Sequence, residues 1–227
     1  MLIVYHGDEV ASMCGRFAQY WPPDLWEAHW PVLWHVKHFE PRYNVAPATL
    51  VLAFTSAGGK EQAELLAWGM GPQARRRINA RWETLWALPK DKGGHVPFIG
   101  AVIPMNGFYE WHRLSHQPYY VTTSSSQPLW ALAVMDAERR LAVVTRDAPG
   151  ELGAIHPRMP VFVPQRLAQE WMHAPGPRVR ALIEADSARA PDALTWWPVS
   201  SRVNNPRAEG PALIQRQTAP VQGVFEW

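Results

Sequence analysis

Cysteine is nearly absent from the 227 residues of this chain, and Cys14 is the only one. A single cysteine excludes an intrachain disulfide and a zinc site built on several thiolates. No apolar run approaches the roughly 18 residues that a membrane helix needs, and residues 1–5 lack the basic start of a secretion signal. We therefore expect a cytoplasmic protein that uses no metal, no cofactor and no membrane.

Lysine is also scarce, with 4 residues against 18 arginines, and the net charge is only +2. This balance excludes a uniformly basic protein that coats DNA, but it leaves room for a local basic groove. Arginine suits bidentate phosphate contacts and stacking, although genome base composition produces the same bias. The 13 tryptophans fit core packing better than base stacking on composition alone.

The apolar patterns predict many short strands and few short helices, an α+β fold with a strongly curved sheet. Residues 50–55 and 64–68 predict a hairpin around a turn at 56–59. Further strands are expected at residues 98–103, 118–123, 129–134, 141–145, 160–163 and 196–199. Helices are expected at residues 24–34, 79–88, 164–172 and 178–185. We expect residues 13–227 to form one domain.

Cys14 has two interpretations. A lone cysteine is most often a small buried hydrophobic residue. However, Met13 precedes it and resembles a second start, and removal of that methionine would leave an N-terminal cysteine. Its α-amine has a pKa near 8, so roughly a tenth is neutral at pH 7 and can attack an aldehyde. The thiol would then close a five-membered thiazolidine in an intramolecular step.

Residues 1–12 conflict with that chemistry because they would acylate the amine. We therefore predict that they are absent from the active protein. A start codon assigned too early is the favoured origin of the extension, and self-cleavage before Cys14 is the alternative.

Four other segments place polar groups in unexpected surroundings: residues 43–47, 79–84, 107–111 and 155–160. Glu110 lies between aromatic residues, so its carboxylate is either on a solvent face or desolvated with a raised pKa, which suits a general acid. Asn79 and Glu83 could be a helix cap with an i,i+4 pair. A histidine and an arginine share the last segment, which could equally be a rigid proline turn.

Six motifs occur together and in a fixed order: Met13-Cys14-Gly15-Arg16-Phe17, Arg42-Tyr43-Asn44-Val45-Ala46-Pro47, Trp68-Gly69-Met70, Asn79-Ala80-Arg81 with Glu83-Thr84, Gly107-Phe108-Tyr109-Glu110-Trp111, and Ile155-His156-Pro157-Arg158-Met159-Pro160. In this combination the chain resembles the SOS-response-associated peptidase (SRAP) family from residue 13 to about residue 205. The resemblance implies a curved, barrel-like mixed β core flanked by short helices. It also implies a sensor of abasic sites in single-stranded DNA that shields the lesion through a covalent thiazolidine.

The same resemblance implies roles for four residues. Cys14 would be the nucleophile, and Asn79 would hold the N-terminal residue and the sugar by hydrogen bonds. Glu110 would be the acid for ring opening and Schiff-base formation. His156 would relay protons and assist reversal of the crosslink.

A set of DNA-contacting residues surrounds these four. By resemblance, Arg16 and Arg81 would bind the phosphates that flank the lesion. Arg42 and Arg158 are the other guanidiniums near the motifs, Pro47 belongs to the same set, and Trp68 and Trp111 are stacking candidates for which core packing is equally favoured. The expected partner is single-stranded DNA that contains abasic sites, bound by a monomer on the damaged nucleoid.

Two other functions remain open. A cysteine peptidase would use Cys14 and His156 with Asn79 as the orienting residue, and it would need no free α-amine. A non-covalent binder of single-stranded DNA would use arginine and tryptophan only, and it would need neither Cys14 nor Glu110.

Overall fold

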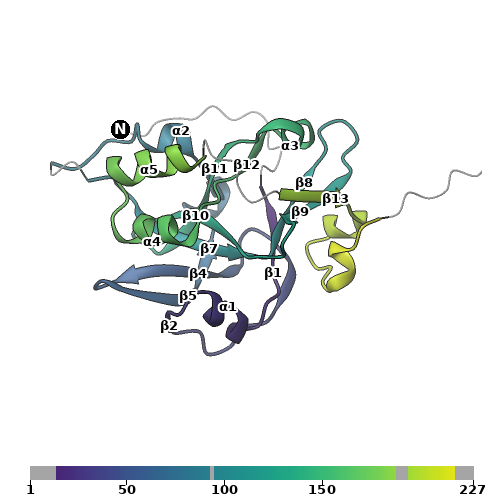
Figure 1. Cartoon of the computed structure of the whole chain (residues 1–227), viewed down its shortest axis with the longest axis horizontal. Coiled ribbons are helices and arrows are strands. Elements are labelled where there is room, and N and C mark those ends of the chain that lie inside the picture. The colour runs from purple at the N-terminus through teal and green to yellow at the C-terminus, as the bar shows by residue number, and fades with distance from the viewer. Residues whose placement is uncertain (1–13, 93–94, 188–193, 218–227) are drawn as a thin grey trace, which may run out of the picture.

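Two β-sheets make up the centre of the protein (Figure 1). The computed structural model describes residues 14–92, 95–187 and 194–217. The five-stranded sheet has the order β13-β9-β8-β1-β3. Its strands are β1 (Arg16–Gln19), β3 (Arg42–Val45), β8 (Gly107–Trp111), β9 (Pro118–Thr123) and β13 (Leu194–Pro198).

The eight-stranded sheet runs β12-β11-β10-β7-β4-β5-β2, with β6 paired to β11 outside this path. Its strands are β2 (Leu33–Trp34), β4 (Leu50–Ala57), β5 (Lys60–Trp68), β6 (Asn79–Arg81), β7 (Ile99–Met105), β10 (Leu129–Met135), β11 (Arg140–Asp147) and β12 (Arg158–Pro160). An additional pairing of β11 with β5 closes a ring of strands β11-β10-β7-β4-β5. Parallel pairs occur beside antiparallel ones, so the predicted curved, mixed sheet of an α+β fold is confirmed.

The continuous apolar runs of β4, β7 and β10 have a physical cause. These strands are buried on both faces along most of their length, so their sequences do not alternate between apolar and polar residues. The predicted hairpin is confirmed as β4 and β5, and its turn is Gly58-Gly59. Both glycines have positive φ values, 56° and 77°, as a two-residue hairpin turn requires.

Three hydrophobic clusters fill the spaces around the sheets. One lies between the eight-stranded sheet and the helices and contains most of the buried tryptophans, including Trp26, Trp30 and Trp171. The second joins the two sheets, with Phe17 and Phe108 of the smaller sheet against Ile103 of the larger one. The third lies between the smaller sheet and the C-terminal segment. Packing therefore accounts for most of the tryptophans, as composition indicated.

The longer helices follow the predictions more closely than the shorter ones. α4 (Gln165–His173) and α5 (Pro177–Ser187) confirm two predicted helices, and α3 (Gly150–Ile155) is short. The helix expected at 24–34 ends earlier, as α1 (Pro23–His29), because Trp30 precedes Pro31 and adopts an extended conformation.

The helix expected at residues 79–88 is wrong in its first part. Residues 79–81 form β6, which pairs in parallel with β11, and only then does α2 (Trp82–Leu85) begin. Tertiary pairing overrides the local pattern here, so Asn79 lies on a strand and Arg81, not Asn79, is the N-cap residue of α2. The strand expected at 160–163 is also displaced: β12 ends at Pro160, and beyond it Phe162 makes an isolated bridge to Ala131.

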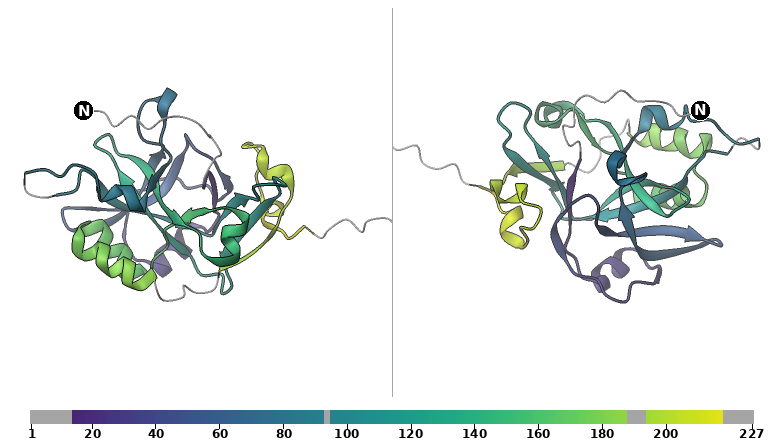
Figure 2. Two further views of the ribbon diagram at one scale, coloured as in Figure 1. Left: turned by 90° about the horizontal axis from the view of Figure 1, so that it is seen from above. Right: turned by 180° about the vertical axis from the view of Figure 1, so that it is seen from behind.

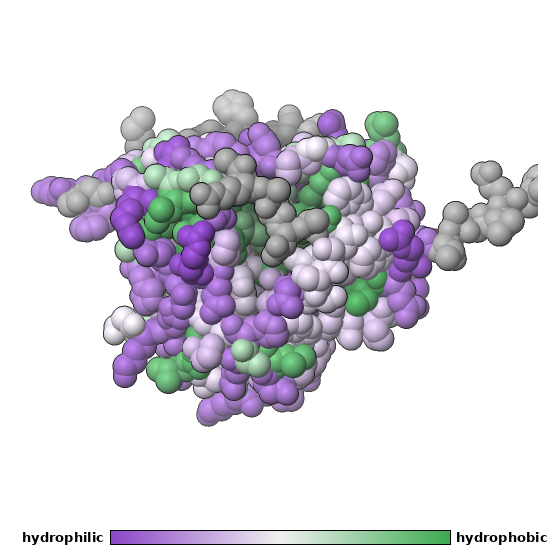
Figure 3. Space-filling view, in the orientation of Figure 1, coloured by the Kyte–Doolittle hydropathy of each residue, from purple (hydrophilic) through white to green (hydrophobic). Residues whose placement is uncertain are grey.

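Different elements lie at the two ends of the molecule. In Figures 1 and 2, α4 and α5 lie at one end, and the C-terminal segment with the 3₁₀ turns η2 (Ser201–Asn204) and η3 (Pro211–Ile214) lies at the other. In the space-filling view most of the visible face is hydrophilic, and hydrophobic residues gather in separate groups (Figure 3). None of the described helices is long and apolar enough to cross a membrane. The prediction for residues 1–12 lies outside the described residues.

Candidate active site

Cys14 and Glu110 meet where β1 begins. β1 and β8 pair antiparallel with Arg16 opposite Tyr109, so the residues just before β1 run beside Glu110. The backbone N–H of Cys14 donates a hydrogen bond to Oε1 of Glu110 at 2.9 Å. Cys14 is 4% exposed and Glu110 is 1% exposed, so of the two surroundings that the sequence allowed for Glu110, the structure has the desolvated one.

Glu110 has the electrostatics of a proton donor. Burial raises its pKa to about 8, against the opposing effect of its contacts with Cys14. Its second oxygen, Oε2, is buried without a hydrogen-bond partner among the described residues, and lies 3.6 Å from Nδ1 of His156. At pH 7 the neutral carboxylic acid is therefore the favoured form.

The Cys14 thiol lies in surroundings that keep it protonated. Burial raises its pKa well above the usual range, and the nearby Glu110 raises it further. Its Sγ lies 3.8 Å from the backbone carbonyl of Arg158, to which the S–H donates a weak hydrogen bond. Cysteine nucleophiles that act as thiolates have the opposite property, a depressed pKa beside a cation or a helix N-terminus.

His156 follows α3 and is buried beside both residues. Its Nδ1 lies 3.0 Å from the carbonyl oxygen of Arg158 and 3.2 Å from the backbone N of the same residue. One tautomer donates to that carbonyl and the other accepts from that N–H, so the backbone of Arg158 can support either. Nδ1 of His156 is thus held by the backbone of Arg158, and the same nitrogen lies on the side of the ring that faces Glu110.

The Arg158 side chain is bound by protein groups rather than open to solvent. Its Nη1 and Nη2 donate to the two oxygens of Glu83, both at 2.9 Å, and Nη1 also donates to Asp147 at 2.6 Å. Nη2 donates further to the carbonyl of Thr145 at 2.7 Å. A phosphate would have to displace these partners, so the geometry favours a positioning role for Arg158 over the phosphate contact expected from the sequence.

Asn79 and Arg81 lie on β6 at the edge of the same region. The parallel register places Asn79 opposite Val143 and Arg81 opposite Thr145, so both share one face of the strand. Asn79 is half-buried and Arg81 is exposed. α2 follows directly and brings Glu83 to Arg158, which ties β6 to the loop that carries His156.

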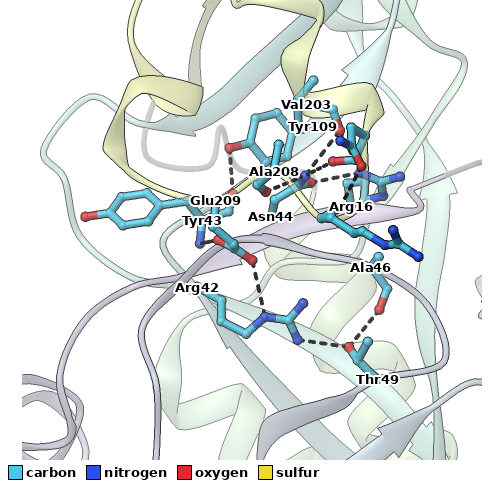
Figure 4. Close-up of polar contacts among 12 residues, drawn as sticks. Arg16, Arg42, Tyr43, Asn44, Ala46, Thr49, Tyr109, Val203, Ala208 and Glu209 are labelled. Atoms are coloured by element: carbon cyan, nitrogen blue, oxygen red, sulfur yellow. Dashed lines mark hydrogen bonds and ion pairs between the residues drawn. The ribbon is translucent and has the colours of Figure 1, made fainter.

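The remaining predicted DNA contacts differ in their surroundings. Arg16 is half-buried and bound to Asn44 and to the carbonyls of Val203 and Asn204 (Figure 4). Arg42 is bound to Glu209 and Thr49. Pro47 is half-buried on the loop after β3.

The two tryptophan candidates also differ. Trp68 is 0% exposed, and its indole N–H donates to the carbonyl of Ile78 at 2.9 Å, so packing is its role here. Trp111 is half-buried, and its indole N–H donates to Asn204 at 2.8 Å. Part of Trp111 is therefore available to a base, whereas Trp68 has no accessible face.

Three residues with structural importance at the site were missed by sequence reasoning. Asp147 and Glu83 hold Arg158, and Asn44 holds Arg16. Glu83 and Asn44 stand inside two of the motifs, so their position was a signal, but nothing in the sequence named their partners. Asp147 carried no signal. Among the residues that the structure describes, no three acidic, histidine or cysteine side chains gather as a metal site.

The structure thus brings a buried cysteine, a buried carboxyl group and a histidine together at the start of a strand in a mixed-sheet α+β fold. The sequence profile of the SOS response associated peptidase (SRAP) family matches residues 13–206, and the chain belongs to this family.

Relatives and solved structures agree with this assignment. The abasic site processing protein YoqW of Bacillus subtilis is 28% identical over 229 residues, covering 89% of this chain and 99% of the relative. The abasic site processing protein YedK of Escherichia coli is 28% identical over 233 residues, with the same coverage. A phage-related protein from Bordetella bronchiseptica has a crystal structure with a TM-score of 0.64 and 32% identity, covering 82% of this chain and 94% of that one.

Proposed function

We propose that this protein crosslinks itself to abasic sites in single-stranded DNA through Cys14, as a monomer of the cytoplasm that acts on damaged DNA. The observation that carries the proposal is the 2.9 Å contact between the Cys14 nitrogen and the buried Glu110 carboxyl, with His156 at 3.6 Å from the other oxygen. The names of the relatives, abasic site processing proteins, support this substrate.

The reaction requires Cys14 as the first residue, and the backbone is consistent with that state. Cys14 has a φ of 44°, a left-handed conformation that costs a non-glycine residue roughly 1 kcal/mol. This cost exists only while a carbonyl group precedes the residue. We therefore propose that residues 1–13 are absent from the active protein, through translation from Met13 and loss of that methionine or through self-cleavage.

Each group has a defined step. Glu110 donates a proton to the ring oxygen of the sugar, the C1–O bond breaks, and the hydroxyl on C1 loses its proton to leave an aldehyde. The α-amine of Cys14 adds to the aldehyde carbon, and water leaves to give an imine. The thiol sulfur then adds to the imine carbon while its proton passes to the nitrogen, which closes the thiazolidine. The net change is loss of one water molecule.

The neighbours of Cys14 suit these reaction steps better than they suit peptide hydrolysis. A thiol that burial keeps protonated supplies both the sulfur and the proton of ring closure. A peptidase would need a thiolate paired with an imidazolium, whereas the structure places a carboxyl group next to Cys14 and turns His156 toward that carboxyl. Non-covalent binding alone gives no reason to bury an acid beside a cysteine.

Intact mass spectrometry tests the proposal. The protein is incubated with a single-stranded oligonucleotide in which uracil glycosylase has converted one uracil to an abasic site. The expected product is the mass of a chain that begins at Cys14 plus the oligonucleotide minus one water, and the same oligonucleotide with its uracil intact is the control. A product that retains Met1, or no adduct from a chain that begins at Cys14, would contradict the proposal.

A further inference from the structure

Asn44 lies at the centre of a polar cluster between β3 and the C-terminal segment (Figure 4). It is 0% exposed although its side chain is polar. Its Oδ1 accepts a hydrogen bond from Nη1 of Arg16 at 2.9 Å. Its Nδ2 donates to three carbonyls of residues 199–214, here named the C-terminal strap: those of Val203 at 3.2 Å, Asn205 at 3.0 Å and Ala208 at 3.1 Å. One buried amide therefore joins Arg16 to the strap.

The strap also binds Arg16 directly. Nη1 of Arg16 donates to the carbonyl of Val203 at 2.7 Å, and Nη2 donates to the carbonyl of Asn204 at 3.4 Å. A guanidinium has five N–H groups in a fixed planar fork. Both N–H groups of Nη1 and one of Nη2 are thus engaged. Among the described residues, no hydrogen bond uses Nε, so one edge of the fork, Nε with the second N–H of Nη2, is left for a ligand.

That edge has the geometry that binds a phosphate or carboxylate with two parallel hydrogen bonds. Arg16 is two residues from Cys14, so a phosphate held there has a fixed distance from the reacting amine. An arginine that could rotate freely would neutralise a phosphate without setting this distance. Orientation of this kind is what turns binding into a productive geometry for an intramolecular reaction.

We propose that Asn44 is the positioning residue of the phosphate contact made by Arg16. It fixes Nη1 against the C-terminal strap and thereby turns the Nε–Nη2 edge toward the DNA backbone beside the lesion. The inference rests on the proposed function, since it takes DNA as the ligand. It assigns a purpose to the Arg42–Pro47 motif that the reaction itself does not use.

The chain offers a matched control for a merely structural effect. Trp197 holds the same strap from another side, because its indole N–H donates to the carbonyl of Ile214 at 2.8 Å. It makes no hydrogen bond to Arg16 or Asn44. Trp197→Phe should therefore loosen the strap without altering the arginine fork.

Binding is measured with a single-stranded oligonucleotide that carries tetrahydrofuran in place of the abasic sugar and so cannot be crosslinked. Fluorescence anisotropy is recorded between about 50 and 200 mM salt, where each phosphate contact contributes a slope of about 0.7 for single strands. Arg16→Gln should lose affinity and about 0.7 of slope. Asn44→Ala should lose most of the same affinity and slope. The double variant should have the affinity and slope of Arg16→Gln. Trp197→Phe should have those of the parent. Parental affinity and slope in Asn44→Ala, or losses that add in the double variant, would overturn the inference.

Arg16→Lys gives an answer even where Asn44→Ala does not fold. Lysine keeps the charge but lacks the fork, so the proposal expects several-fold weaker binding, and parental affinity would overturn it. Crosslinking to an aldehyde lesion is followed in parallel. A parent that binds the analogue with the expected coupling yet forms no crosslink keeps the role of Asn44 and overturns only the thiazolidine chemistry. A parent that neither binds the analogue measurably nor forms a crosslink overturns both, and a parent that crosslinks without measurable affinity for the analogue overturns only the role of Asn44.

Discussion

The reactive cluster of Cys14, Glu110 and His156 contrasts with the cluster around Asn44, although both are buried. In the first, Glu110 Oε2 has no hydrogen-bond partner among the described residues, and Cys14 has a positive φ. In the second, both polar atoms of the Asn44 amide are bonded, and they link three segments of the chain. The two sites lie close together because Arg16 begins the strand that Cys14 precedes.

This difference separates chemistry from positioning. A buried polar atom without a partner costs free energy, and it remains available to a substrate. A saturated network is rigid and holds its neighbours in one arrangement. We therefore expect substitutions in the reactive cluster to change rates, and substitutions in the saturated cluster to change affinity and stability.

Cys14 should show the largest effect. Cys14→Ala removes the sulfur that closes the ring, so the stable adduct should disappear from denaturing gels after heating. Cys14→Ser should give at best a weaker adduct, because oxygen closes a less stable ring than sulfur. A heat-stable adduct formed by Cys14→Ala would contradict the thiazolidine. It would also mean that the cluster around Cys14 does not differ in chemical role from the cluster around Asn44.

Glu110→Gln should slow crosslinking by about 10²–10⁴-fold, the usual contribution of a general acid. Affinity for the tetrahydrofuran analogue should change far less, because the carboxyl acts on the ring oxygen rather than on phosphates. Single-turnover crosslinking at saturating protein measures the rate, and anisotropy measures the affinity. Equal losses in both would place Glu110 among the positioning residues.

The pH dependence of the same rate sharpens this assignment. The α-amine reacts when neutral, so the rate should rise up to its pKa near 8. Glu110 donates only while protonated, so the rate should fall again above its pKa of about 8. The parent should thus show a maximum close to pH 8, and Glu110→Gln should keep the rise and lose the fall.

His156→Ala should still form the adduct but release it more slowly, on the order of 10²-fold for a lost proton carrier. Reopening of the thiazolidine needs a proton on the departing sulfur, and His156 is held where it can deliver one through Glu110. The measurement is a chase of the preformed crosslink with excess competing lesion DNA. Release at the parental rate would mean that another group carries this proton.

Glu110→Gln should also make the protein more stable at alkaline pH. The folded pKa of about 8 lies above the unfolded value near 4.3, so ionisation opposes folding. The parent should lose stability as pH rises from about 4.3 to about 8, whereas glutamine has no charge to bury. Thermal unfolding at several pH values tests this. The melting temperature should differ by roughly 2–4 °C for each kcal/mol of difference in unfolding free energy between the two proteins. Parallel curves for the two proteins would contradict the raised pKa.

The sequence predicted the strands better than the contacts between side chains. Apolar runs such as that of β10 identify buried strands because a strand buried on both faces must be apolar throughout. Residues 79–81 were predicted helical because their local pattern does not reveal the parallel pairing with β11.

For the site, the sequence identified Cys14, Glu110 and His156, and the structure brings them together. It did not identify the groups that accept hydrogen bonds from the side chains of Arg158 and Arg16. Those contacts join residues 75 and 187 positions apart, and only the folded chain determines which groups meet at such separations.

The smallest predicted effect compares two arginines in the same motif set. Arg81 is exposed on β6, whereas the Arg158 fork is bound by Glu83 and Asp147. Arg81→Gln should weaken binding of the tetrahydrofuran oligonucleotide regardless of base sequence and reduce the salt slope by about 0.7. Arg158→Gln should leave that slope unchanged, because its charge is already neutralised by protein carboxylates. It should instead slow crosslinking, since the backbone of Arg158 holds both His156 and the Cys14 thiol. A slope change in Arg158→Gln as large as that in Arg81→Gln would show that DNA displaces the carboxylates and would return Arg158 to the phosphate-binding set.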